Sequence, residues 1–136
     1  ELDPEEIIKL MLLNKNLGIN CVFATRYNRI NPFKSFWDLG NFLFTFFFNL
    51  VYKSFLQDVL CCAKAFYIND VSPKNLKSIK FDIDVEISSI LVRKHQFKNQ
   101  KFVNVNYNRR TKKDGNNLGF SDSFFIMKRI ILKNLF

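Results

Sequence analysis

Apolar and polar residues divide the chain into a densely apolar first half and a polar, basic second half. Apolar side chains dominate from Phe33 to Phe66, with Gly40 and Asn49 as interruptions. The uncharged part, Leu39 to Tyr52, has fourteen residues, whereas a membrane-spanning helix needs about 20. We therefore expect packed core helices here, with a transmembrane helix as the minor alternative.

Local signals predict where elements begin and end. The sequence Asp-Pro-Glu-Glu at residues 3–6 combines a capping side chain, Pro at the first helical position and acids at the positive end of a helix dipole. It predicts a helix to about Leu13, followed by a loop from Asn14 to Asn20. Cys21 to Ala24 is a short buried run, and Asn31-Pro32 is a second helix-start signal.

Two periodicities overlap between Leu76 and Leu91, after a turn cluster at Asn69 to Pro73. As in a half-buried strand, the apolar residues Phe81, Ile83, Val85 and Ile87 alternate with Asp82, Asp84 and Glu86. The apolar residues that also fit the spacing of a helix are Leu76, Ile79, Ile83, Ile87, Ile90 and Leu91. Periodicity alone does not choose between strand and helix.

The stretch from Arg93 to Lys113 is polar and basic, and it is expected to be extended. It contains eight positive side chains and no acid in twenty-one residues: Arg93, Lys94, Lys98, Lys101, Arg109, Arg110, Lys112 and Lys113. The interleaved aromatic residues Phe97, Phe102 and Tyr107 are suited either to stacking on unpaired bases or to anchoring the stretch on the core. The pattern indicates a surface for a polyanion, with a merely solvated tail as the alternative.

A last amphipathic helix is expected from Phe124 to Phe136. Asp114 to Asn117 forms a turn cluster before it, and Ser121 to Ser123 offers capping side chains. The turn suggests that this helix folds back onto the protein.

Charge and composition change this picture in two ways. The chain carries a net charge of +9, all of it in residues 71–136, which suggests a nucleic-acid or anionic-membrane partner. Phe, Asn, Lys and Ile, which have AT-rich codons, supply 60 of the 136 residues, whereas Ala, Gly, Pro and Arg supply 16. Such bias indicates an AT-rich genome, for which a mitochondrial genome is a good candidate.

Candidate catalytic and metal-binding groups are few, and no cofactor is expected. His95 is the single histidine, so a histidine triad or cluster is excluded, and a phosphate or base contact is the better interpretation. Asp82, Asp84 and Glu86 are more typical of a solvated face than of a divalent-ion site. Cys61-Cys62 favours core packing over catalysis. Without a phosphate-binding glycine loop or a nucleophile motif, an enzyme is not expected.

Several short motifs resemble, in order, those of the universal small-subunit ribosomal protein thirteen family. The residues concerned are Asn14-Lys15, then Thr25, Ile30, Pro32, Lys34 and Ser35 within Val22 to Ser35, then Asp82-Ile83, Ile87 to Ile90 and Arg93-Lys94-His95, and finally Arg110 to Lys113 with Asn116-Asn117. Together they cover about half of the chain. The Phe-rich residues 36–72 lie outside the resemblance.

The resemblance implies a mainly α fold: a small helical domain with a helix–two-turn–helix element, an extended basic C-terminal tail and a short terminal helix. It favours helix for Leu76 to Leu91. It implies contacts with ribosomal RNA, a place beside protein nineteen in the head of the small subunit, and a tail near the peptidyl-site tRNA. RNA contact carries over to Lys34, Arg93, Lys94, His95, Arg110, Thr111 and Lys112.

The sequence therefore predicts a mitochondrial small-subunit ribosomal protein without catalytic activity, located in the matrix. Its expected parts are a helical domain (1–92), an RNA-binding tail (93–117) and a C-terminal helix (118–136). The expected RNA-binding residues are Lys34, Arg93, Lys94, His95, Lys98, Lys101, Arg109, Arg110, Thr111, Lys112 and Lys113. The alternatives are another organelle-encoded ribosomal protein and an accessory subunit of an inner-membrane respiratory complex.

Overall fold

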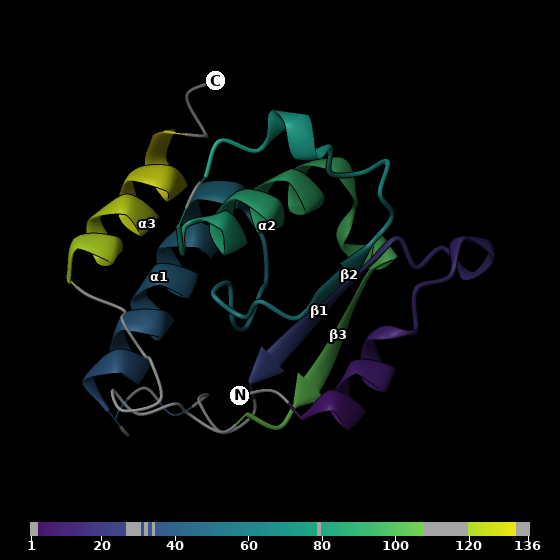
Figure 1. The fold of residues 1–136 in the computed structure, drawn as a ribbon, viewed down its shortest axis with the longest axis horizontal. Coiled ribbons are helices and arrows are strands. Elements are labelled where there is room, and N and C mark those ends of the chain that lie inside the picture. The colour runs from purple at the N-terminus through teal and green to yellow at the C-terminus, as the bar shows by residue number, and fades with distance from the viewer. Residues whose placement is uncertain are drawn as a thin grey trace.

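The computed structural model describes residues 3–26, 31, 33, 35–78, 80–107 and 120–132, without the side chains of residues 120, 121 and 132. In chain order its elements are the 3-10 helices Pro4–Leu10 and Lys15–Leu17, strand β1 (Cys21–Arg26), helix α1 (Phe36–Tyr52), strand β2 (Lys64–Phe66), the 3-10 helix Pro73–Asn75, helix α2 (Ile83–Lys94), the 3-10 helix Phe97–Asn99, strand β3 (Gln100–Val105) and helix α3 (Phe120–Leu132). From β1 onward, strands and α-helices alternate (Figure 1).

The three strands form a mixed sheet in the order β2-β1-β3. Strand β1 runs antiparallel to β2 and parallel to β3, with Cys21 opposite Phe66 on one side and Gln100 on the other. All six residues of β1 are buried, because the strand is paired along both edges and covered on both faces. The α-helices cover one face, and the first 3-10 helix packs on the other (Figure 1).

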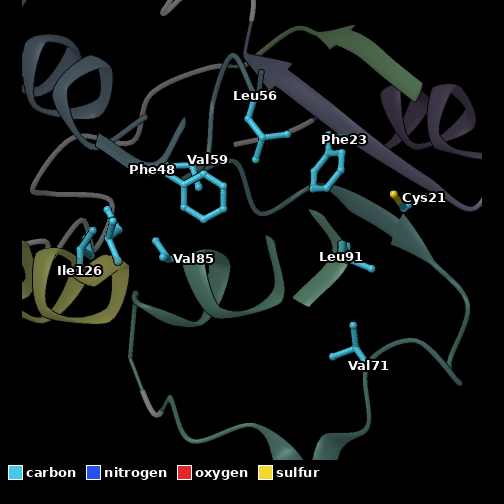
Figure 2. Packing of buried hydrophobic residues seen from close by; sticks show 10 residues of the cluster. Cys21, Phe23, Phe48, Leu56, Val59, Val71, Val85, Leu91 and Ile126 are labelled. Atoms are coloured by element: carbon cyan, nitrogen blue, oxygen red, sulfur yellow. The ribbon is translucent and has the colours of Figure 1, made fainter. Parts of the chain in front are cut away.

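The main hydrophobic core lies between the sheet and the three α-helices (Figure 2). It joins Cys21 and Phe23 of β1, Phe48 of α1, Val85 and Leu91 of α2, and Ile126 and Ile130 of α3, together with Leu56, Val59 and Val71 from the connections. Full burial of such a side chain contributes about 1.5–3 kcal/mol. Helix α3 is therefore an integral part of the core, as the expected fold-back of the last helix requires.

The expected mainly α fold is wrong: the protein is mixed α/β, about half helical and 17% strand. Cys21 to Ala24 was expected only to be a short buried run, and it belongs to the central strand Cys21–Arg26. The expected tail contributes strand β3, which pairs with β1 along its whole length. Val103 and Val105 pack on the side of the first 3-10 helix, and Phe102 packs on the main core from the other face of the strand. Isolated apolar residues in a basic stretch were therefore enough to build a strand.

The expected helices differ from the observed ones mainly at their ends. Residues 83–94 are helical, so helix was the right choice there, although α2 begins seven residues after Leu76. The first helix is a 3-10 helix that ends at Leu10, and the Asp3 side chain caps it by accepting a hydrogen bond from the Glu5 N–H. Helix α1 begins at Phe36, with Ser35 rather than Asn31 as its cap.

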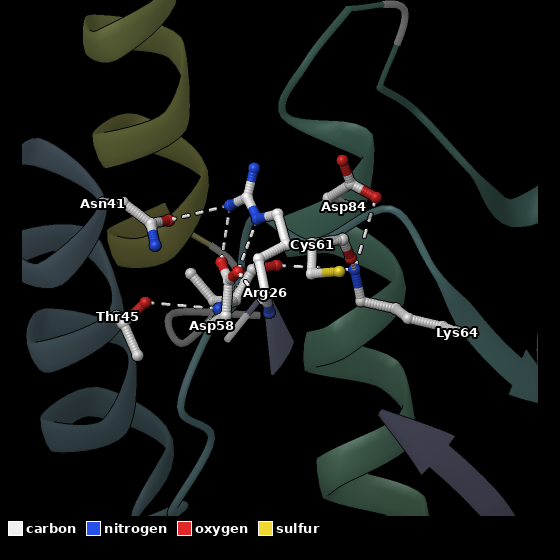
Figure 3. Close-up of polar contacts among 8 residues, drawn as sticks. Arg26, Asn41, Thr45, Asp58, Cys61, Lys64 and Asp84 are labelled. Atoms are coloured by element: carbon white, nitrogen blue, oxygen red, sulfur yellow. Dashed lines mark hydrogen bonds and ion pairs between the residues drawn. The ribbon is translucent and has the colours of Figure 1, made fainter. Parts of the chain in front are cut away.

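Helix α1 turns polar residues toward the protein interior. Asp38, Asn41, Thr45 and Phe48 are its buried residues. The Thr45 hydroxyl accepts a hydrogen bond from the Val59 N–H at 3.2 Å, and Asn41 lies beside the buried Arg26 (Figure 3). Most of the apolar side chains of α1 therefore lie on its outer face. Among the described residues, no helix is long and apolar enough to cross a membrane.

Candidate nucleic-acid interface

The first three predicted RNA-binding residues of the basic stretch lie at the end of α2 and contact the protein itself. Lys94 Nζ lies 2.9 Å from a carboxylate oxygen of Asp70, and His95 Nε2 lies 3.0 Å from the other oxygen. The guanidinium carbon of Arg93 is 5.2 Å from the centre of the Tyr52 ring. These three side chains therefore have structural contacts, and Lys94 and Arg93 also remain exposed to solvent.

Lys94 and His95 change the pKa of the Asp70 carboxyl group. Burial alone raises the pKa of its carboxyl group, but hydrogen bonds from Lys94 and His95 outweigh this effect and hold the pKa below its ordinary value. The carboxylate is thus charged in the folded protein. It offsets part of the positive charge at the end of α2.

The next two predicted residues, Lys98 and Lys101, are exposed and form no ion pair or hydrogen bond with another described residue. Lys98 lies in the 3-10 helix Phe97–Asn99, and Lys101 lies on the edge strand β3. The chain carries no acid from Ile87 to Asn106. Both ammonium groups are available to an anion.

A row of aromatic rings runs from this basic region into the core. Phe55 and Phe97 meet edge to face with their centroids 5.5 Å apart, Phe97 and Phe102 are 5.6 Å apart, and Phe102 stacks on Phe23 at 5.9 Å. The outer rings are largely exposed, Phe55 by 71% and Phe97 by 57%. Phe102 thus anchors the stretch on the core, as one of the two sequence interpretations expected, while Phe97 is left at the surface.

Lys53, Phe55, Phe97 and Lys98 form what we call the aromatic–basic surface. Lys53 and Phe55 lie in the loop after α1, and the ring contact joins this loop to the 3-10 helix Phe97–Asn99. Exposed rings offer faces on which bases stack, and ammonium groups beside them neutralise phosphates. The arrangement is suited to holding a single strand without chemical change.

Hydrogen bonds fix both halves of this surface. The Asn49 side chain donates to the Leu56 carbonyl at 2.8 Å and accepts from the Leu56 N–H at 3.0 Å and the Ser54 hydroxyl at 2.8 Å. On the other half, the Asn99 side chain donates to the Gly18 carbonyl at 2.8 Å. The aromatic–basic surface is therefore preorganised rather than carried on an unanchored loop.

The carboxylates of Asp82, Asp84 and Glu86 do not form the solvated face that the sequence suggested. Asp82 is paired with Arg129 at 2.8 Å, and Asp84 Oδ1 lies 3.3 Å from Lys64 Nζ. Glu86 is fully buried and accepts hydrogen bonds from the N–H groups of Lys77 and Ser78 at 3.0 and 2.7 Å. Among the described residues no group of side chains is arranged to hold a metal ion.

Cys61 lies beside a buried ionic network (Figure 3). Arg26 donates two hydrogen bonds to Asp58, at 2.5 and 2.7 Å, and Lys64 donates to the Cys61 carbonyl. Burial raises the pKa of the Cys21 thiol to about 12 and that of Cys61 to about 11. Both thiols are protonated at neutral pH and buried, whereas Cys62 is exposed. The expectation of core packing therefore holds for Cys61 alone of the adjacent pair.

Lys34, Arg109, Arg110, Thr111, Lys112 and Lys113 lie outside the described residues. Of the surface that is described, sequence reasoning missed Lys53 and Phe55. Both belong to the Phe-rich segment, where abundant Phe residues hide a single exposed one. No pattern in the sequence distinguishes Phe55 from its neighbours, because its role depends on contact with Phe97, which is distant in the chain.

Comparisons with known proteins add no relative from which a role could be transferred. No family model, no curated protein and no solved structure matches the chain.

Proposed function

We propose that the chain is a structural, RNA-binding constituent of the mitochondrial small ribosomal subunit and that it has no catalytic activity. The observation that carries the proposal is the aromatic–basic surface, where the exposed rings of Phe55 and Phe97 neighbour Lys53 and Lys98, which form no ion pair with another described residue. Stacking on bases and neutralisation of phosphates need no further group. The net charge of +9, concentrated in the second half, supports the same class of partner.

The composition and the motif order support the finer parts of the proposal. The abundance of amino acids that have AT-rich codons favours a mitochondrial gene. The ordered motifs that resemble ribosomal protein thirteen favour the small subunit, with ribosomal RNA and neighbouring proteins as partners. The mixed sheet differs from the fold implied by that resemblance. A place near protein nineteen and the peptidyl-site tRNA therefore rests on motif order alone.

RNA binding by the full chain tests the proposed surface. We expect Phe97→Leu to weaken binding of a single-stranded oligoribonucleotide roughly tenfold, because Leu keeps the apolar packing and loses the stacking face. Lys98→Ala should also weaken binding and should reduce the slope of log K against log salt by about 0.7. Fluorescence anisotropy titrations at several salt concentrations measure both effects.

Phe124→Leu is the matched control, because Phe124 is 68% exposed on α3 and lies outside the aromatic–basic surface. Its affinity for RNA should equal that of the wild type. Equal affinities for wild type and Phe97→Leu, or binding that does not change with salt, would contradict the proposal. Association with the ribosome is tested separately, by sedimentation of the chain with mitochondrial small subunits.

A second candidate function is that of an accessory subunit of an inner-membrane respiratory complex. The outward apolar face of α1 favours it, because such a face is suited to a large protein assembly. Fractionation distinguishes the two functions. A chain that stays with membranes at high salt and never sediments with ribosomal subunits belongs to the second class.

A further inference from the structure

The outer face of α1 carries a continuous apolar seam. Leu39, Leu43, Phe46 and Leu50 are spaced by four, three and four residues, which is the a/d spacing of a heptad repeat. Phe42 and Phe47 flank the seam, and all six side chains are between 37% and 66% exposed. The sole charged residue of α1, Asp38, is buried. A helix that exposes such a seam is suited to packing against a second apolar helix.

Gly40 lies in the second turn of α1, next to this seam, and no contact with a described residue explains it. A Cβ atom added at Gly40 would meet nothing within 4 Å. Glycine in a helix interior costs about 0.5–1 kcal/mol relative to alanine. The missing side chain leaves a notch beside Leu39 and Leu43, and a notch of this kind lets a large ring from another helix approach the backbone.

A second copy of α1 complements both features. If two helices pack antiparallel with Leu43 of one opposite Phe46 of the other, Leu39 meets Leu50 in the flanking layers. Phe47 of each copy then lies beside Gly40 of the other, so a large ring faces the notch. A twofold axis makes each contact twice, which is the usual geometry of a homodimer. The antiparallel orientation also opposes the two helix dipoles.

The exposed area and the charge of the outer face of α1 also resemble those of a protein–protein interface. The six side chains expose on the order of 700 Å² of apolar surface, near the roughly 800 Å² per partner of a standard interface. The positive charge of the chain lies in residues 71–136, whereas residues 1–70 carry equal numbers of basic and acidic residues. Two copies can therefore approach through α1 without bringing a concentrated charge together.

We propose that the free chain forms a twofold-symmetric dimer through the outer face of α1. This inference goes beyond the proposed function and does not depend on it. Strand β3 is an edge strand of the sheet, whereas the proposed dimer face is the outer face of α1. Dimerisation through this face leaves β3 accessible, and the two proposed surfaces adjoin at the end of α1, where Lys53 and Phe55 follow the helix.

Sedimentation equilibrium of the full chain, from about 1 to 100 µM, tests the proposal. We expect a reversible dimer with a micromolar Kd. Gly40→Leu should weaken it at least about tenfold, although Leu adds apolar surface, because its side chain fills the notch. The same change should not lower the thermal stability of the monomer, since Leu has the higher helix propensity and its Cβ has no described atom within 4 Å. Phe46→Glu should abolish the dimer.

Met11→Glu is the control, because Met11 is 77% exposed and lies after the first 3-10 helix, away from α1. Its Kd should match that of the wild type. A wild-type chain that stays monomeric at the highest concentration overturns the proposal. The outer face of α1 would then be expected to bind a different protein. A Gly40→Leu chain that dimerises as tightly as the wild type also overturns it. RNA-binding titrations remain interpretable in either case.

Discussion

At the scale of single residues, the protein buries several charged groups and gives them ion-pair or hydrogen-bond partners. Arg26 and Asp58 are both nearly buried and form a bidentate pair, while the Arg26 guanidinium also lies 5.3 Å from the centre of the Tyr107 ring. Burial alone would lower the pKa of Arg26, but the hydrogen bonds that it donates to the Asp58 carboxylate raise the pKa above its ordinary value. Arg26 is therefore an internal cation and does not belong to the RNA-binding charge.

The Arg26–Asp58 pair predicts an asymmetric response to substitution. Asp58→Ala should lower the free energy of unfolding by about 3–5 kcal/mol, because it leaves a buried guanidinium without its partner. The double variant Arg26→Met, Asp58→Leu should recover much of this loss, since no unpaired charge remains. Urea unfolding of the three proteins measures the difference. A double variant less stable than Asp58→Ala would show that the pair is needed for more than charge balance.

Asp70 predicts a dependence of stability on pH. Its pKa is lower in the folded protein than in the unfolded chain, so its contribution is present above the unfolded pKa and is lost as the pH falls through the folded value. Below about pH 4, the unfolding free energy of the wild type should therefore fall more steeply than that of Asp70→Asn. Thermal unfolding between neutral and acidic pH measures both curves. Parallel curves would contradict the assignment to Asp70.

At the scale of elements, the end of α1 links helix geometry to the proposed RNA surface. Lys53 caps the helix in the left-handed conformation with φ of 50°, where its N–H donates to the Asn49 carbonyl. Glycine is the usual residue at such a position, because an L side chain is strained there. A lysine at this strained position is consistent with a use for its charge.

Lys53→Gly should therefore separate stability from binding. We expect the free energy of unfolding to rise by up to about 1 kcal/mol, because the left-handed conformation costs glycine little. Affinity for single-stranded RNA should fall, and the slope of log K against log salt should decrease by about 0.7, as for the loss of one phosphate contact. Denaturant unfolding and RNA titrations on the same preparations measure both. An unchanged slope of log K against log salt would show that Lys53 makes no contact with an RNA phosphate.

Elements with strong local signals could be predicted from the sequence, whereas pairings between distant segments could not. Asp3 does cap the first helix, and residues 83–94 are helical. Strand β3 carries only weak alternation, and its partner β1 lies more than seventy residues away, so no periodicity indicates the pairing. The same limit applies to the candidate site: Phe97 stands out beside Lys98, while Phe55 gains its role only through a tertiary contact.

At the scale of the whole molecule, the two proposed interfaces differ in their chemistry, so salt should distinguish them. RNA binding neutralises phosphates and releases counterions, so affinity should fall by orders of magnitude as the salt concentration rises. The α1 face contains no exposed charge, so the Kd of the dimer should stay nearly constant or tighten. Parallel titration and sedimentation across one salt series measure both. A dimer that dissociates with rising salt would point to charged contacts instead of α1.

The position of β1 also determines when the chain can fold during its synthesis. The ribosome makes Cys21–Arg26 first, and the parallel partner Gln100–Val105 is made only after both α1 and α2 have been synthesised. Contacts between such distant segments form slowly, because a long loop must close first. The apolar side chains of the central strand therefore stay uncovered for longer, and the nascent chain is vulnerable to aggregation until strand β3 has been made.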